Sequence, residues 1–215
     1  MPDLGSDAVR RLKRNKDGSW QLIGHVGFEL AGGPRHVAFH GKQLIIRRRR
    51  HQLDQVMDLD GYLYTLLELK SKVVRHRFPP LPAFPTFIKS TSTMSNPPPG
   101  RTDMLAAEIL IPPPNSSFPT PYLYISNRND PSPEGDIISI FSIQNSDSLE
   151  LIAEIRTGLK HLRGMAFGGP DDEYLIAGGV NRGGVKIFER IDGGKSLRLI
   201  VTNNSVEAPT SFLWL

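Results

Sequence analysis

The stretch of sequence that decides the fold is Gly61-Tyr-Leu-Tyr-Thr-Leu-Leu-Glu68. A small turn residue leads into an aromatic residue, an apolar run follows, and a charged residue closes it, which is typical of a short β-strand bounded by turns. The same pattern returns at Pro121–Arg128 and, with an uncharged end, at Glu173–Val180. Three copies of one strand type indicate a repeat protein built from β-sheets.

The spacing of the copies indicates the architecture. Their leading tyrosines, Tyr62, Tyr122 and Tyr174, lie 60 and 52 residues apart, and a period of about 50 is typical of arrays of four-stranded sheets such as β-propellers. Equivalent strand positions in successive blades point toward a shared axis. We therefore expect Glu68 and Arg128, which occupy equivalent positions, to meet at that axis.

The rest of the chain divides into similar strands, and strong helix signals are absent. We therefore predict an all-β fold: a partial β-propeller of about four blades, built from four-stranded antiparallel sheets, as a single domain over residues 1–215. The strands that we expect are Val9–Lys13, Trp20–Phe28, a short one within Gly32–His40, Tyr62–Leu69, Lys72–Phe78, Pro85–Thr91, Ala106–Ile111, Tyr122–Asn127, Ile137–Ile143, Leu149–Arg156, Met165–Phe167, Tyr174–Gly178, Val185–Arg190 and Ser196–Val201.

Residues 41–60 interrupt the repeat. Phe167 precedes its tyrosine-led strand by 7 residues, whereas Phe39 precedes Tyr62 by 23. The segment has no turn chemistry of its own, so we interpret it as an insert foreign to the fold. Its run Arg47–Arg50 could be a targeting or phosphate-binding patch, but we favour a solvated, disordered insert.

Composition excludes several classes of protein. The 215 residues include 20 glycines, 18 prolines and no cysteine, which favours many turns and excludes disulfides and thiolate metal sites. No apolar run approaches the ~18 residues of a membrane-spanning helix, and no secretory signal is evident at the start, so we expect a cytoplasmic protein without membrane contact. Half of the net charge of +4 comes from residues 41–60, and no aromatic-interleaved basic face accompanies it, so we expect no nucleic-acid partner.

Several motifs together resemble one family. They are Gly33-Pro-Arg-His-Val-Ala-Phe-His40, Leu66-Leu-Glu-Leu69, Tyr124-Ile-Ser-Asn-Arg128 and His161-Leu-Arg-Gly-Met165. As a set they resemble the lactonase-type seven-bladed β-propellers, which include 6-phosphogluconolactonase-like proteins and the fungal carboxy-cis,cis-muconate cyclases. The resemblance covers the chain except residues 41–60, and the fungal cyclase-like branch looks nearest. Seven blades of about 50 residues need about 350, so it implies an N-terminally shortened form.

The resemblance also implies a pocket at the propeller axis. Arg35, Glu68 and Arg128 match the family's catalytic residues, and Arg35, His36 and Arg128 are the implied substrate-binding residues. A further family histidine, one blade earlier, has no counterpart in this sequence. The implied substrate is a small anion, either a sugar-acid lactone or a carboxymuconate, and the implied chemistry needs no metal and no cofactor.

The chemistry of these residue types fits such a pocket. Arginines can hold a carboxylate or phosphate in bidentate fashion and stabilise an oxyanion, and Glu68 can serve as a general base. Glu68 and Arg128 could instead pair as a purely structural salt bridge. We therefore expect an enzyme that hydrolyses or forms a lactone, with a catalytically inactive binding module as the alternative. An incomplete propeller would also expose sheet edges that favour self-association.

Overall fold

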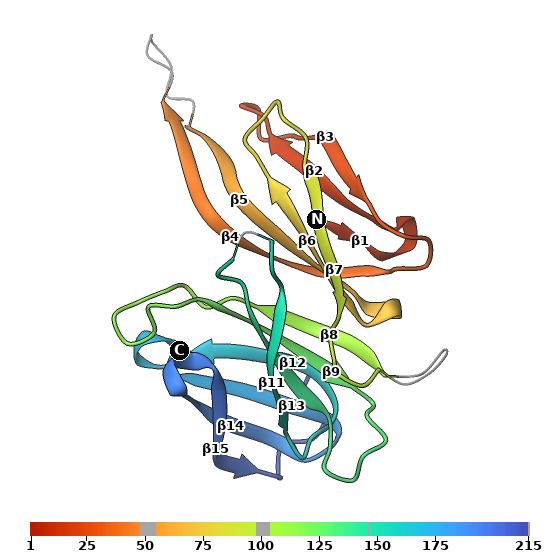
Figure 1. Ribbon diagram of the computed structural model, residues 1–215, viewed down its shortest axis with the longest axis vertical. Helices are drawn as coiled ribbons and strands as arrows, with labels where there is room; N and C mark the ends of the chain where they lie inside the picture. The colour runs from red at the N-terminus through yellow and green to blue at the C-terminus, as the bar shows by residue number, and fades with distance from the viewer. Residues whose placement is uncertain (48–54, 98–103, 146, 215) are drawn as a thin grey trace.

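The computed structural model describes residues 1–47, 55–97, 104–145 and 147–214, and for residues 43–47 and 55–59 it describes the backbone alone. Four antiparallel sheets follow one another along the chain (Figure 1). We call them blades 1 to 4. Blade 1 has the order β1-β2-β3, blade 2 β4-β5-β6-β7, blade 3 β8-β9-β10-β11 and blade 4 β12-β13-β14-β15. The predicted all-β propeller architecture is therefore confirmed, although blade 1 has three strands rather than four.

The strands lie close to their expected positions. Their bounds are β1 Pro2–Asp3, β2 Ala8–Arg14, β3 Trp20–Gly27, β4 Pro34–Arg47, β5 Gln55–Leu67, β6 Lys72–Phe78, β7 Thr86–Ser92, β8 Leu105–Leu110, β9 Tyr122–Arg128, β10 Ile137–Ser142, β11 Glu150–Arg156, β12 Lys160–Gly168, β13 Tyr174–Arg182, β14 Gly184–Ile191 and β15 Ser196–Asn203. Among the described residues, four of the connections between strands contain a single 3₁₀ turn: η1 Leu4–Ser6, η2 Glu68–Lys70, η3 Pro170–Asp172 and η4 Asp192–Gly194. Glu68 thus begins a turn after β5 instead of ending the strand.

The core lies between successive blades, and β9 shows why. All seven residues of β9 are buried. Tyr122 and Tyr124 pack in the cluster shared with blade 4, whereas Leu123 and Ile125 pack in the cluster shared with blade 2. Successive side chains of a strand point to opposite faces, so a strand of a blade packed between two others needs apolar residues on both faces. The apolar run that marked the repeat is the consequence.

The segment 41–60 differs from the disordered insert that we expected. Its described residues continue β4 and β5 as a paired antiparallel hairpin, with register partners from Gly41↔Gly61 to Arg47↔Gln55. Figure 1 shows this hairpin extending beyond the other strands of blade 2. Residues 48–54, with Arg48–Arg50, lie outside the described residues. The foreign origin of the segment stays a prediction.

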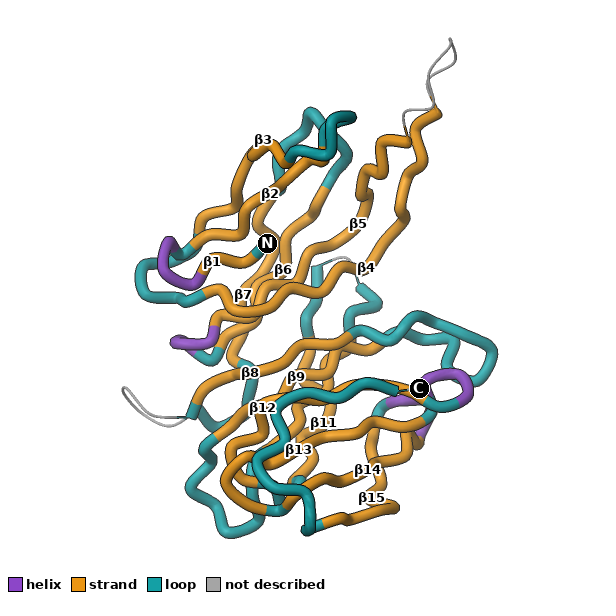
Figure 2. Tube along the Cα trace, turned by 180° about the vertical axis from the view of Figure 1, so that it is seen from behind, coloured by secondary structure: helices purple, strands orange, loops and turns teal. Residues whose placement is uncertain are grey.

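The C-terminal segment covers one face of blade 4. A Cβ atom at Gly164 would lie 2.3 Å from the carbonyl oxygen of Thr210, and one at Gly178 would lie 2.6 Å from the Phe212 ring. Only glycine permits so close an approach. Figure 2 shows the segment crossing in front of β12 and β13. This face of the last blade is therefore covered by the chain's own end.

Candidate functional site

The structure brings Arg35, Glu68 and Arg128 together, although 93 residues separate the first from the last. Arg35 lies at the start of β4, Glu68 at the start of η2 and Arg128 at the end of β9. Arg35 Nη1 donates to Glu68 Oε2 at 2.9 Å, and Arg128 Nη2 donates to Glu68 Oε1. The glutamate is thus held between two arginines of neighbouring blades.

These three side chains are largely removed from water. The exposed fraction of the side chain is 7% for Glu68, 9% for Arg128 and 18% for Arg35. An ion pair in such surroundings interacts more strongly than on the surface, but each charge also loses hydration. Burial accordingly lowers the pKa of Arg128, Glu68 opposes this change, and the neighbouring cations Arg35 and Arg163 add to it.

The backbone around Glu68 is fixed by a glycine turn. The Glu68 amide donates to the Gly33 carbonyl at 2.9 Å. Gly33 has a positive φ of 64°, and a Cβ there would lie 2.7 Å from Leu69 Cγ, so glycine is required. Asp7 Oδ1 in turn accepts the Gly33 amide at 2.9 Å. Blade 1 therefore helps to position the carboxylate in blade 2.

Arg35 is fixed from blade 3. Its Nε donates to the Ala107 carbonyl at 2.9 Å, which leaves Nη1 directed at Glu68. Arg128, in contrast, has a buried Nε without a hydrogen-bond partner among the described residues. A buried donor without a partner is unfavourable, so Arg128 has unused capacity to bind an anion.

His36 does not join this group. The sequence resemblance implied a substrate-binding role, but its side chain is 40% exposed and its Nδ1 lies 3.6 Å from Glu108 Oε1. The ring thus faces the Glu108 carboxylate of blade 3, while Glu68 is occupied by the two arginines. A role for His36 in substrate binding stays a prediction.

Blade 4 adds two residues that the sequence analysis did not place in the site. Burial lowers the pKa of His161, and the electrostatic influence of Arg128 and Arg163 adds to this effect. His161 Nδ1 lies 2.8 Å from Asn129 Oδ1, next to Arg128 in the chain. Arg163 is exposed. The sequence signal for Arg163 was the motif at residues 161–165, because its arginine corresponds to Arg35 in the motif at residues 33–40.

The arrangement can bind and activate an anionic substrate. Arg35 and Arg128, from blades 2 and 3, hold a single carboxylate, and Arg163 of blade 4 lies near enough to lower the pKa of Arg128. An oxyanion that develops beside these arginines would be stabilised electrostatically. Within the described part of the chain, no cluster of three or more histidine, aspartate or glutamate side chains could hold a metal ion. None of its helices is both long and apolar enough to cross a bilayer.

Comparisons with known proteins place the chain in a family. A family model described as "Lactonase, 7-bladed beta-propeller" matches residues 1–214. The chain is 26% identical over 214 residues to a 6-phosphogluconolactonase of Bacillus subtilis (strain 168), an alignment that covers 99% of this chain and 52% of the relative. The chain therefore spans about half the length of this curated relative.

Solved structures share the fold. A protein from Lactobacillus plantarum superposes with a TM-score of 0.74 at 21% identity, over 97% of this chain and 52% of the other. The periplasmic gluconolactonase of Pseudomonas aeruginosa superposes with a TM-score of 0.70 at 17% identity, over 97% of this chain and 51% of the other. At these identities the likeness concerns the fold alone.

Proposed function

Because the chain belongs to the lactonase family of seven-bladed β-propellers, we propose that it hydrolyses the lactone of a small anionic sugar acid. The observation that carries the proposal is the buried carboxylate of Glu68 between Arg35 and Arg128. The name of the Bacillus subtilis relative, a 6-phosphogluconolactonase, supports a phosphorylated sugar acid as the substrate.

Each residue has a role in this reaction. Arg128, with its unpartnered Nε, binds the anionic group together with the exposed Arg163. Glu68 accepts a proton from water, the resulting hydroxide adds to the lactone carbonyl carbon, and the arginines stabilise the oxyanion. The ring C–O bond then breaks, and its oxygen takes up the proton. Glu68 must exchange one arginine contact for the water molecule when substrate binds.

Two other functions remain as candidates for the same residues. A muconate-type cyclase would run related chemistry in the ring-forming direction, with a carboxymuconate as the anion. An inactive binding module would keep the Arg35–Glu68–Arg128 ion pairs only to join blades 2 and 3, and the engagement of both Glu68 oxygens favours that role. The rate of turnover distinguishes these functions.

The test is the hydrolysis rate of three lactones above the uncatalysed rate: 6-phosphogluconolactone, unphosphorylated gluconolactone and carboxymuconolactone. The proposal predicts the highest kcat/KM for the phosphorylated lactone, because the arginines bind a dianion more strongly than a neutral sugar. A preference for carboxymuconolactone would support the cyclase branch. If folded protein hydrolyses none of the three lactones faster than the uncatalysed rate, the inactive binding module is the remaining function.

A further inference from the structure

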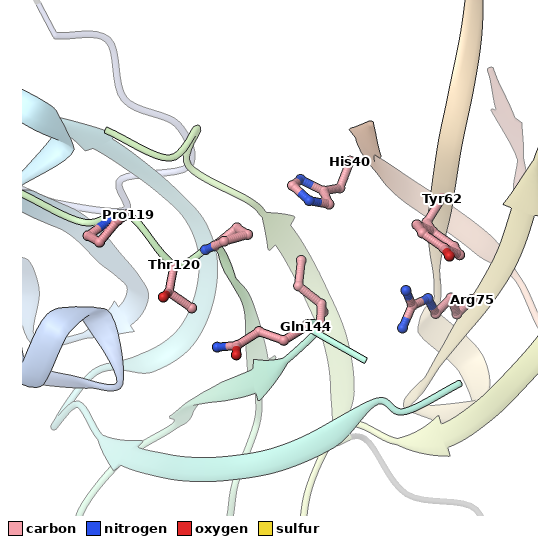
Figure 3. Close-up of a pocket in the computed structure, with 8 residues that line it drawn as sticks. His40, Tyr62, Arg75, Pro119, Thr120 and Gln144 are labelled. Atoms are coloured by element: carbon pink, nitrogen blue, oxygen red, sulfur yellow. The ribbon is translucent and has the colours of Figure 1, made fainter. Parts of the chain in front are cut away.

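A polar cavity lies between blades 2 and 3, away from the axial residues. Its volume is about 400 Å³, and its lining includes His40, Tyr62, Arg75, Thr120 and Gln144 (Figure 3). Tyr62 and Glu68 are six residues apart in an extended segment, so the cavity and the axial site lie about 20 Å apart at opposite ends of the blade. Its residues take no part in the proposed lactonase chemistry.

Arg75 on β6 is the central group of this cavity. It is 1% exposed, and its guanidinium carbon lies 4.0 Å from the centre of the Tyr62 ring. Its Nη1 donates to the carbonyls of Asn145 and Ser148, both at 2.6 Å. Figure 3 shows the guanidinium directed toward Gln144. The cation is therefore buried among aromatic and neutral polar groups.

Arg75 has no counter-charge in the part of the chain that the structure describes. Among the described residues, no carboxylate lies within 4.0 Å of its guanidinium, and its buried Nε has no hydrogen-bond partner. A buried donor without a partner is unfavourable, and more so when it belongs to a charged group. A bound anion that accepts a hydrogen bond from Arg75 would relieve that cost.

Two more unpartnered groups lie beside Arg75. The hydroxyl of Tyr64 and Oγ of Ser148 are buried without partners in the described structure. Tyr64 is paired with Arg75 in the register of β5 and β6, and burial raises the pKa of its phenol to about 12, so it stays a donor. Three of the six buried side-chain atoms without a partner among the described residues thus belong to Arg75 and two of its neighbours.

Arg190 shows that the fold can satisfy a buried arginine without an anion. It is 4% exposed and stacks at 3.8 Å on the Phe118 ring, as Arg75 stacks on Tyr62. Its Nε donates to the Tyr124 hydroxyl at 3.3 Å and its Nη1 to the Asp172 carbonyl at 3.2 Å. The unused Nε of Arg75 is therefore a feature of this cavity and not of the stacking arrangement.

We propose that this cavity is a binding site for a small oxyanion, the carboxylate or phosphate group of a metabolite, with Arg75 as its main ligand. Thr120 and Gln144 provide neutral hydrogen-bonding groups at the rim. Burial, followed by the influence of Arg75, lowers the pKa of His40, so this ring stays neutral near pH 7 and the positive charge of the site comes from Arg75. The site is independent of lactone hydrolysis.

The test is an NMR titration of the ¹⁵N-labelled chain with inorganic phosphate and, separately, with acetate, each at constant ionic strength. We expect saturable shifts of the Thr120, Gln144 and Asn145 amides with at least one anion, and the responding anion identifies the group. Gln144→Glu places a carboxylate beside Arg75 and should weaken the apparent affinity at least tenfold. Its Tm in anion-free buffer should not fall, because the new carboxylate supplies the missing charge.

Controls separate this site from the axial one and from simple misfolding. Arg128→Gln removes an axial arginine and should leave the titration unchanged within about twofold. Thr120→Glu repeats the charge test if Gln144→Glu does not fold. Absence of saturable shifts in the wild-type chain, equal affinity in the glutamate variants, or loss of binding in Arg128→Gln would overturn the proposal. In that case Arg75 only anchors the loop at Asn145 and Ser148.

Discussion

Asp136 is the residue whose replacement should destabilise the axial region most clearly. It is completely buried, and burial raises the pKa of its carboxyl group. Oδ1 accepts the amide of Asp130, two residues beyond Arg128, and Oδ2 accepts the amide of Leu162 in β12, both at 2.8 Å. One side chain thus joins the end of β9 in blade 3 to the first strand of blade 4.

The structure sets the size of the effect. Asp136→Ala leaves two buried N–H groups without acceptors, and each costs about 1–3 kcal/mol, so the free energy of unfolding should fall by about 2–6 kcal/mol. Asp136→Asn keeps one acceptor and turns an NH₂ group toward the other amide, so about 1–3 kcal/mol is expected. Typical domains are stable by ~5–15 kcal/mol, so the alanine variant should be strongly destabilised.

Urea unfolding followed by circular dichroism measures these differences, provided that the m value is unchanged. Asp17→Ala is the matched control, because Asp17 Oδ1 also accepts a backbone amide, that of Ser19 at 2.9 Å, but in an exposed turn where water can replace it. It should cost less than about 1 kcal/mol. Equal effects of Asp136→Ala and Asp17→Ala would refute the reasoning.

Three further predictions concern other parts of the chain. Burial lowers the pKa of His76 below 6.5, so the unfolded chain binds more protons than the folded chain and stability should fall as the pH drops below about 6.5. His76→Phe should make Tm depend less on pH in this range, and an unchanged dependence would contradict the prediction. Tyr124→Phe removes the buried hydroxyl that donates to Gly194 and accepts from Arg190, and urea unfolding should show a loss of about 1–3 kcal/mol rather than none. In the edge strand β15, residues 199–201 are 45–47% exposed, so this strand should pair with a second copy of the chain. Sedimentation velocity should then show a mass that rises with protein concentration, and a monomer at every concentration would exclude the pairing.

Much of the fold could be predicted because the sequence encodes it locally. The tyrosine-led strands begin with apolar residues on both faces because both faces are buried, as β9 shows with Leu123 and Tyr124. The repeat then placed Glu68 and Arg128 at equivalent ends of neighbouring blades, and the structure brings them into contact. In a repeat protein, the place of a residue within its own repeat therefore also fixes where it lies relative to the equivalent residues of neighbouring repeats.

The rest depends on contacts that no local pattern records. His161 lies in a β-bulge of β12, between Lys160 and Leu162, and a bulge redirects a side chain in a way that strand alternation does not predict. Asp136 precedes β10 without any motif of its own, and only the packed blades show the two amides that it accepts.

The hairpin of β4 and β5 has a different explanation. The spacing between Phe39 and Tyr62 indicated an insert, but once two antiparallel strands are joined, pairing can continue residue by residue along both of them. The described register from Gly41 to Arg47 follows that course. The segment that the spacing indicated as an insert therefore extends the sheet of blade 2.

The central claim is that the carboxylate held between Arg35 and Arg128 carries the chemistry. The most direct measurement is kcat/KM for 6-phosphogluconolactone with Glu68→Gln beside Glu108→Gln, a nearby carboxylate that faces His36, with circular dichroism to confirm that both variants are folded. We predict a loss of about 10²-fold or more for Glu68→Gln, as for removal of a general base, and a change within about twofold for Glu108→Gln. Wild-type turnover by the folded Glu68→Gln variant would contradict the claim.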